Sequence, residues 1–167
     1  MITIETARLV LRPFAEGDLD AYAALCADAE VMRYVADGRT LDRETAWRQI
    51  AMFLGHWTLR GHGLWALEPK AGGPMIGFAG LWSPEGWPGI EIGWRLARPA
   101  WGRGYATEAA TVVRDWAFAD PRLDPLVSVI DQDNARSIRV AEKIGGALAR
   151  RLDGEDAHRL LYAYRRA

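Results

Sequence analysis

A loop with two closely spaced glycines, followed at once by a helix, is the segment of this sequence best suited to bind a ligand. Residues 101–109 read Trp-Gly-Arg-Gly-Tyr-Ala-Thr-Glu-Ala, with Gly102 and Gly104 one residue apart. Such a loop presents backbone N–H groups at a helix N-terminus, where the helix dipole adds positive potential. With Arg98 and Arg103 beside it, this arrangement favours phosphate. The same glycines also suit a tight turn that only allows close helix packing, so both interpretations stay open.

The residues around this loop exclude the commoner phosphate and nucleophile motifs. No Lys-Ser/Thr pair follows Gly104, so the loop is not a P-loop, and the third glycine of the dinucleotide fingerprint is missing. No Gly-x-Ser-x-Gly elbow of a hydrolase is present. His56 and His62, six residues apart, are a poor metal pair, and we expect them at the surface or in a pocket wall. The single Cys26 lies beside an apolar stripe and is interpreted as a core thiol.

The elements that must position the loop follow from hydrophobic spacing and turn residues. Strands are expected at residues 6–14 near a sheet edge, 64–68, 75–82, 90–96, 126–131, 147–152 and 158–164. Helices are expected from an Asp18 cap to 27, briefly from 28, from an Asp42 cap to the stop at Gly61, at 105–119 and at 134–144. Three consecutive strands joined by turns predict an antiparallel meander, which a strand, loop, helix and strand then follow. The pattern is a mixed α/β (α+β) domain.

Length and composition limit the class of protein. The chain has 167 residues with a net charge of −1, which fits one globular domain spanning 1–167 and argues against a nucleic-acid binder. One cysteine excludes an internal disulfide, and no apolar run approaches a membrane span, so we expect a cytoplasmic protein without a membrane or metal partner. All 8 tryptophans fall between residues 47 and 116.

Three colinear segments resemble a known family. Residues 101–106 are similar to the acyl-CoA pyrophosphate loop of the GNAT superfamily of N-acetyltransferases, and residues 134–145 resemble its second signature helix. The opening Thr-Ala-Arg-Leu-Val-Leu-Arg-Pro at 6–13 resembles the ribosomal-protein-alanine N-acetyltransferase (RimJ/RimL-like) branch. Trp101 departs from the usual Gln or Arg, and Ala141 from a tyrosine that many members use as a general acid. The resemblance implies a mostly antiparallel central sheet of about seven strands, flanked by helices and splayed at the cofactor site.

The resemblance also implies acetyl-CoA as cosubstrate and direct attack of an amine on its thioester. Glu91, at the start of the strand before the loop, is the candidate general base, with a solvent-facing edge carboxylate as the alternative. Ser137 is the candidate acid for the departing thiolate, because a serine at this position serves in the branch that the sequence resembles. Glu108 is interpreted as a helix-dipole partner. The expected cofactor-binding residues are Trp94, Arg95, Leu96, Trp101, Gly102, Arg103, Gly104, Tyr105, Ala106, Thr107, Asn134 and Ser137. Gly93 is compatible with a bulge that splays the strand.

The nature of the acceptor stays open. An α-amine with a pKa of about 7.8 is partly neutral at pH 7, whereas deprotonating a lysine with a pKa of about 10.4 costs roughly 4 to 5 kcal/mol. A modest base therefore suits a protein N-terminus or a small-molecule amine. A non-catalytic acyl-CoA-binding sensor or adaptor is the alternative function, and the protein is expected as a monomer or homodimer.

The tryptophans yield a spatial prediction. Trp47 and Trp57 are placed on the helix bordering the acceptor, Trp82 and Trp87 beside a loop between central strands, and Trp94 and Trp101 at the cofactor. We expect about half of the eight to line the cleft, because indoles are large, rigid and amphipathic.

Overall fold

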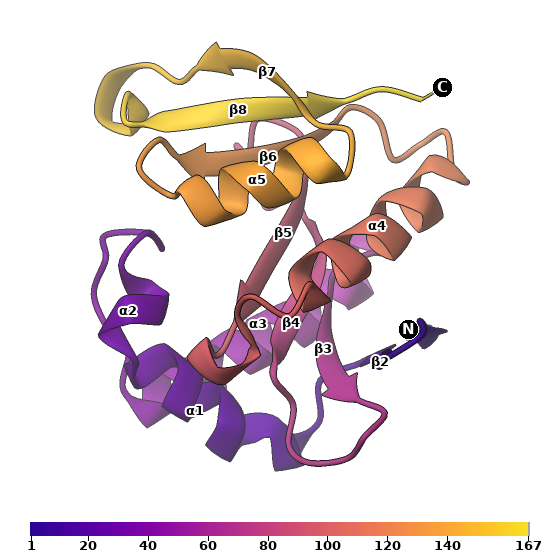
Figure 1. The fold of residues 1–167 in the computed structure, drawn as a ribbon, viewed down its shortest axis with the longest axis vertical. Helices are drawn as coiled ribbons and strands as arrows, with labels where there is room; N and C mark the ends of the chain where they lie inside the picture. Colours follow the sequence, from indigo (N-terminus) through magenta and orange to yellow (C-terminus); the bar gives the residue numbers. More distant parts are fainter. Residues whose placement is uncertain (167) are drawn as a thin grey trace.

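One eight-stranded sheet organises the molecule (Figure 1). The structure, a computed structural model, describes residues 1–166, so the last residue of the expected domain lies outside the described range. The strands are β1 (Ile4–Glu5), β2 (Leu9–Arg12), β3 (Leu64–Pro69), β4 (Gly77–Trp82), β5 (Ile90–Leu96), β6 (Leu126–Asp131), β7 (Ala147–Arg151) and β8 (Arg159–Tyr164). Their order is β1-β2-β3-β4-β5-β6-β8-β7, and only β5 and β6 pair in parallel. The antiparallel meander of β3, β4 and β5 is confirmed.

The helices begin and end close to their expected positions. They are α1 (Leu19–Ala27), α2 (Ala29–Met32), α3 (Arg43–Arg60), α4 (Tyr105–Phe118) and α5 (Ala135–Lys143), with short 3-10 turns at Glu16–Asp18, Arg98–Ala100 and Gly154–Asp156. The Asp42 side chain accepts from Thr45 N–H at 2.8 Å, and Gly61 ends α3 in the left-handed conformation. No helix of the described residues is long and apolar enough to cross a membrane.

Two hydrophobic cores lie on opposite faces of the sheet. In Figure 1, α4 crosses in front of the strands and α3 lies behind β3 and β4. The core under α4 includes Val113 together with Leu11 and Ile92 of the sheet. The core on the other face joins α1 and α3 to the sheet through Tyr22 and Phe53. The sheet therefore stands between two packed layers, which hold its central strands in place.

The sheet splays apart between β5 and β6. These strands pair only at Ile90 with Leu126 and at Glu91 with Val127, although β5 pairs with β4 as far as Leu96. In Figure 1, β5 runs away from β6 toward the α1 and α2 end of the molecule. The expected splay is confirmed, and it leaves the second half of β5 open on the side of β6.

Three local expectations are wrong. Residues 6–14 are not one strand, because the chain turns at residues 6–8 between β1 and β2. The short strand β1 was not expected, and it brings the number of strands in the sheet from about seven to eight. The Asp18 side chain does not cap α1; it accepts from Ala15 N–H at 2.8 Å and pairs with Arg12 at 2.7 Å, since a buried carboxylate needs a counterion. Gly93 forms no bulge, because it pairs in regular register with Gly80 and the splay lies on its other side.

Candidate functional site

A groove of about 510 Å³ lies where the sheet opens. Its walls come from the end of β5, the loop before α4, the first turn of α4 and the start of α5. Of the expected cofactor-binding residues, all but Arg103 line it: Trp94, Arg95, Leu96, Trp101, Gly102, Gly104, Tyr105, Ala106, Thr107, Asn134 and Ser137. Tertiary structure thus brings two segments, about 30 residues apart in the sequence, to one cavity.

The glycine loop has the backbone that an anion site requires. Gly102 and Gly104 adopt φ values of 72° and 80°, which residues with a side chain rarely adopt. Gly104 is the residue immediately before α4. The first N–H groups of a helix have no partner within it. Because Gly104, Tyr105 and Ala106 line the groove, this positive helix end faces the cavity.

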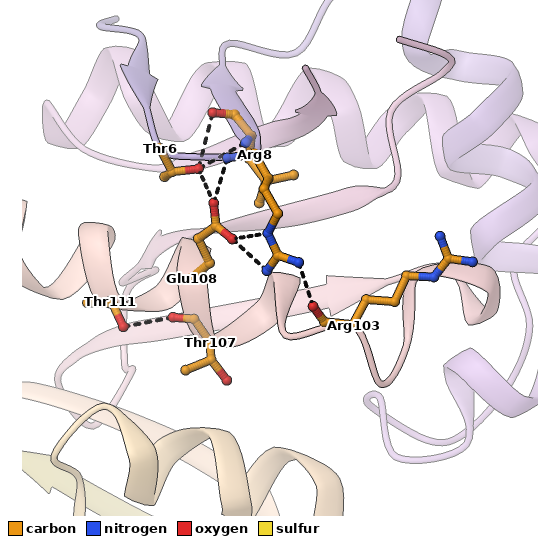
Figure 2. A network of polar contacts seen from close by, with 7 residues as sticks. Thr6, Arg8, Arg103, Thr107, Glu108 and Thr111 are labelled. Carbon is orange, nitrogen blue, oxygen red and sulfur yellow. Dashed lines mark hydrogen bonds and ion pairs between the residues drawn. The ribbon is translucent and has the colours of Figure 1, made fainter. Parts of the chain in front are cut away.

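A polar network ties the N-terminal turn to this loop (Figure 2). Arg8 donates from Nε to Glu108 Oε2 at 2.7 Å and from Nη1 to the Arg103 carbonyl at 2.8 Å. Thr6 Oγ1 donates to Glu108 Oε1 at 2.6 Å, and the Arg8 guanidinium lies 4.5 Å from the centre of the Tyr105 ring. Burial acts against ionisation, yet the bonds from Thr6 and Arg8 hold the pKa of Glu108 below its ordinary value. Glu108 therefore acts on the loop as an anchor.

The arginines around the loop have different roles from those expected. Arg98 pairs with Asp28 at 2.7 Å. The Arg103 side chain extends away from Arg8 and Glu108, and only its carbonyl joins the network (Figure 2). Arg136 and Arg139 of α5 line the groove, and the Arg136 guanidinium stacks 4.0 Å from the centre of the Trp101 ring.

Two residues at the start of α5 face the same groove. Asn134 Oδ1 accepts from Ser137 N–H at 3.2 Å, so Asn134 caps the helix as expected. Ser137 is partly buried and lines the groove and a second cavity. Its hydroxyl is therefore placed near the junction of the two cavities.

The second cavity, of about 460 Å³, joins the groove. Both are lined by Tyr34, Val35, Trp94, Arg95, Asn134 and Ser137. Beyond this junction, Phe53, Phe78, Trp82 and Trp87 give the second cavity an aromatic wall. A ligand in the groove and a ligand in the second cavity would thus meet at the open half of β5.

Glu91 lies in the wall of the second cavity. Trp87 Nε1 donates to its Oε2 at 2.7 Å, and Val129 N–H approaches its Oε1 at 3.5 Å. Burial raises the pKa of Glu91 to about 7, although these two donors and the charge of Arg159 act in the opposite direction. A carboxyl group with this pKa exchanges protons readily near neutral pH.

Sequence reasoning missed some residues that shape the site. Tyr34 follows a short helix that carries no chemical motif, so no local signal pointed to it. The Ser128 hydroxyl donates to the Ile92 carbonyl at 2.6 Å and accepts from Tyr164 at 2.8 Å, which joins three strands beside the splay. Trp87 was expected near the cleft, but its bond to Glu91 depends on a loop fold that the sequence does not specify.

Half of the tryptophans line the site, as expected, and two of the six placed there do not. Those that line the groove or the second cavity are Trp82, Trp87, Trp94 and Trp101. The expectation for Trp57 is wrong: it lies in the core beside Trp65, and its Nε1 donates to the Leu64 carbonyl at 2.9 Å. Trp47 is 47% exposed and lines neither cavity, because it lies on the side of α3 that faces away from the sheet.

For the histidines the surface placement is wrong, although His62 does lie in a pocket wall. His56 and His62 are buried, and His56 Nδ1 contacts the His62 carbonyl at 2.9 Å. Burial lowers the pKa of both rings, that of His62 to about 4. Cys26 is a buried free thiol, as expected. Among the described residues, no group of three or more metal-binding side chains occurs.

Comparison with known proteins gives consistent matches. The family model described as the acetyltransferase (GNAT) domain matches residues 8–147. A Bacillus licheniformis protein named N-acetyltransferase p20 is 27% identical over 146 residues, covering 86% of this chain and 82% of that protein. The match therefore spans both the glycine loop and α5.

Solved structures share the fold over nearly the whole chain. An acetyltransferase from Agrobacterium tumefaciens is 36% identical, with a TM-score of 0.88 over 99% of this chain and 95% of its own. RimL, a ribosomal L7/L12 α-N-protein acetyltransferase solved with coenzyme A, is 18% identical, with a TM-score of 0.80 and 97% of each chain covered. At that identity, the second likeness concerns the fold alone.

Proposed function

Because the chain belongs to the GNAT acetyltransferase family, an acyltransferase family that uses acetyl-CoA, we propose that its groove and second cavity together acetylate a primary amine. The observation that carries this proposal is the junction of the two cavities at β5. The groove has the features of a phosphate site, and the second cavity contains a carboxyl group able to accept a proton. Donor and acceptor can therefore meet without a covalent enzyme intermediate.

The groove supplies features that suit acetyl-CoA. The N–H groups at the start of α4 bind the pyrophosphate, and Arg136 and Arg139 bind the phosphate at the adenosine end. The half of β5 that does not pair with β6 offers backbone groups to the amide-bearing pantetheine arm around Trp94 to Leu96. N–H groups of the same strand polarise the thioester carbonyl.

Glu91 accepts a proton from the amine, directly or through one water. The raised pKa of Glu91 lies closer to the pKa of an α-amine than the pKa of an ordinary glutamate does. The pKa difference from an α-amine is about one unit, whereas a lysine lies more than three units above. The acceptor is therefore a protein N-terminus or a small amine of modest basicity.

Ser137 donates a proton to the leaving thiolate. It lies at the junction, and Asn134 orients the first turn of its helix. Tyr34 also lines the junction and carries a hydroxyl, so the substitution Tyr34→Phe tests whether it shares this role.

Free-thiol release from acetyl-CoA in the presence of an amine panel tests the proposal. We expect release with at least one amine and a loss of roughly 100-fold in kcat/KM for Glu91→Gln, because general-base catalysis contributes about 10²–10⁴-fold. Arg48→Gln, on the exposed face of α3, is the control. Acetyl-CoA binding without turnover of any amine would instead support a sensor or adaptor.

A further inference from the structure

Arg95 is the charged residue of the second cavity whose partners are incomplete. Its Nη1 is buried and has no hydrogen-bond partner among the residues that the structure describes. The guanidinium lies 5.1 Å from the centre of the Phe78 ring, on the α1 and α3 side of the sheet. By contrast, Arg159 in the same wall donates to the Ala36 carbonyl at 3.0 Å and pairs with Asp156.

An unpartnered guanidinium donor is costly to bury. A charged donor without an acceptor forfeits its hydration, whereas a carboxylate offers a guanidinium two parallel hydrogen bonds. Arg95 lines both the groove and the second cavity, so a ligand at their junction can reach it after rotation of the side chain. The guanidinium also lies near Tyr22 and Cys26, both neutral groups, so an anionic group of a ligand would supply the acceptor that Nη1 lacks.

The floor between Arg95 and Glu91 is open. Glu91, Gly93 and Arg95 alternate along β5, so they share one face of the sheet. A Cβ added at Gly93 would have only one neighbour within 4 Å, Glu91 Oε1 at 3.9 Å. Gly93 thus leaves room above the strand, with a carboxyl group on one side and a guanidinium on the other.

One wall of the cavity is aromatic, and the cavity is of limited size. Phe53, Phe78 and Trp82 form an aromatic wall, and Phe53 contacts the other two rings at centroid distances of 5.6 and 5.7 Å. A volume of about 460 Å³ suits a small molecule with an apolar body. Asp131 and Arg159 also line the cavity, but each has partners within the protein. The carboxyl group of Glu91, the guanidinium of Arg95 and the aromatic wall together fit a zwitterion with an apolar side chain.

We propose that the acceptor is a small amino carboxylate with an apolar or aromatic body, held by its carboxylate on Arg95. This inference rests on the proposed acetyl transfer. The amine nitrogen lies above Gly93 and the body packs on Phe53 and Trp82. In the transfer, a C–N bond forms and the thioester C–S bond breaks. One proton of the ammonium group leaves through Glu91, a second is lost as the amide forms, and the thiolate takes up one proton.

Matched pairs of amines test the inference. Thiol release from acetyl-CoA is measured with phenylalanine, methionine and amino acids of longer amine-to-carboxylate spacing, each beside its own primary amide. For at least one pair we expect kcat/KM for the acid to exceed that for the amide roughly 10- to 100-fold, the range of a charge-assisted hydrogen bond. The amide has the less basic amine, so amine ionisation opposes this preference.

Variants at position 95 identify the residue responsible. Arg95→Gln should collapse the acid-to-amide ratio toward one, mainly by raising KM for the acid. Arg95→Lys should keep part of the ratio because it keeps the charge. Arg48→Gln removes the same charge from the exposed side of α3 and should leave the ratio intact.

The outcomes separate this inference from the proposed function. Thiol release with peptides or polyamines, but with no pair preferring the acid, would overturn the carboxylate assignment and leave acetyl transfer standing. An acid preference that survives in Arg95→Gln would also overturn it. If no amine of any class supports thiol release, the proposed function fails as well. The wild-type comparison of acid and amide needs no variant, so it holds even if a variant fails to fold.

Discussion

At the scale of the residue, Glu91 has the environment that most affects chemistry. Its carboxyl group is removed from water in the cavity wall but has two hydrogen-bond donors, Trp87 and Val129. Desolvation is stronger than both, so the pKa rises to about 7. The ionised form is therefore available at neutral pH and retains more basicity than an exposed carboxylate.

The pH dependence of the reaction should report this group. Glu91 is a base only when ionised, so kcat/KM should rise with pH through about 7. With an acceptor whose amine pKa lies well above 7, ionisation of the amine gives a separate limb at higher pH. Glu91→Gln should lose the limb near 7 and keep the other. A limb near 7 that persists in the variant would assign it to another residue.

The same pKa makes Glu91 a cost to stability at high pH. Its pKa in the folded protein lies above the ordinary glutamate value of 4.5, so the folded state binds the proton more tightly than the unfolded state does. The protonated Glu91 makes its full contribution to the free energy of unfolding below about pH 4.5. This contribution, at most on the order of 3 kcal/mol, is lost as the pH rises through about 7. We expect Glu91→Gln to be more stable relative to wild type at pH 8 than at pH 4.5. Urea unfolding at both values measures this; an equal difference at both would contradict it.

At the scale of the element, the glycine loop is held from outside its own helix. The turn between β1 and β2 places Arg8 and Thr6 against Glu108, in the first turn of α4, and against the Arg103 carbonyl (Figure 2). The partners are about 100 residues apart in sequence. The opening motif of the chain thus supports the N-terminal end of α4 while itself lining no part of the groove.

Substitutions that break this network should weaken the binding of acetyl-CoA more than they lower kcat. Arg8→Gln removes the charge that holds the loop, so we expect KM for acetyl-CoA to rise roughly 3- to 10-fold with kcat changed less than twofold. Glu108→Gln should raise KM for acetyl-CoA by a similar factor. The double variant should have a KM little higher than that of either single variant, because both changes break the same interaction. Arg43→Gln, which breaks the exposed pair with Asp20, is the control. A fall in kcat with KM unchanged would contradict a positioning role.

At the scale of the whole molecule, the site exists because two halves meet across the splay. β1 to β5 with their helices supply one wall, and β6 to β8 with α5 supply the other (Figure 1). Only two residue pairs join β5 to β6 directly, supported by the bonds of Ser128. A ligand in the groove contacts both halves, so its binding energy adds to their association.

Acetyl-CoA should therefore raise the unfolding temperature. At 100 times Kd, a ligand that binds only the folded state stabilises it by about 2.7 kcal/mol. That corresponds to a rise of several degrees for a domain of this size. Thermal unfolding with and without acetyl-CoA measures the shift.

Gly104→Leu provides the control for this shift. Its positive φ strains any side chain, at about 1–2 kcal/mol, and a bulky residue there blocks the approach of phosphate to the helix end. We expect the ligand-free protein to fold with a slightly lower unfolding temperature and the shift with acetyl-CoA to disappear. A full shift in this variant would refute the position given to the pyrophosphate.

Local sequence patterns determined most of the elements and the chemical class of the site. Strand and helix ranges, the Asp42 cap and the glycine loop follow from side-chain spacing and backbone preference, which act over a few residues. Most of the groove was predictable as well, because those residues lie in two continuous motifs, whereas the contribution of Tyr34 and its neighbours was not.

Tertiary structure alone decided the contacts between distant side chains. In the folded protein Trp57 lies in the core, and His56 and His62 are buried. Asp18 pairs with Arg12, and Arg8 pairs with Glu108. Tertiary structure also raised the pKa of Glu91, since desolvation depends on everything packed around a group. Such outcomes depend on the sum of contacts that segments far apart in the chain make, and no local pattern contains that sum.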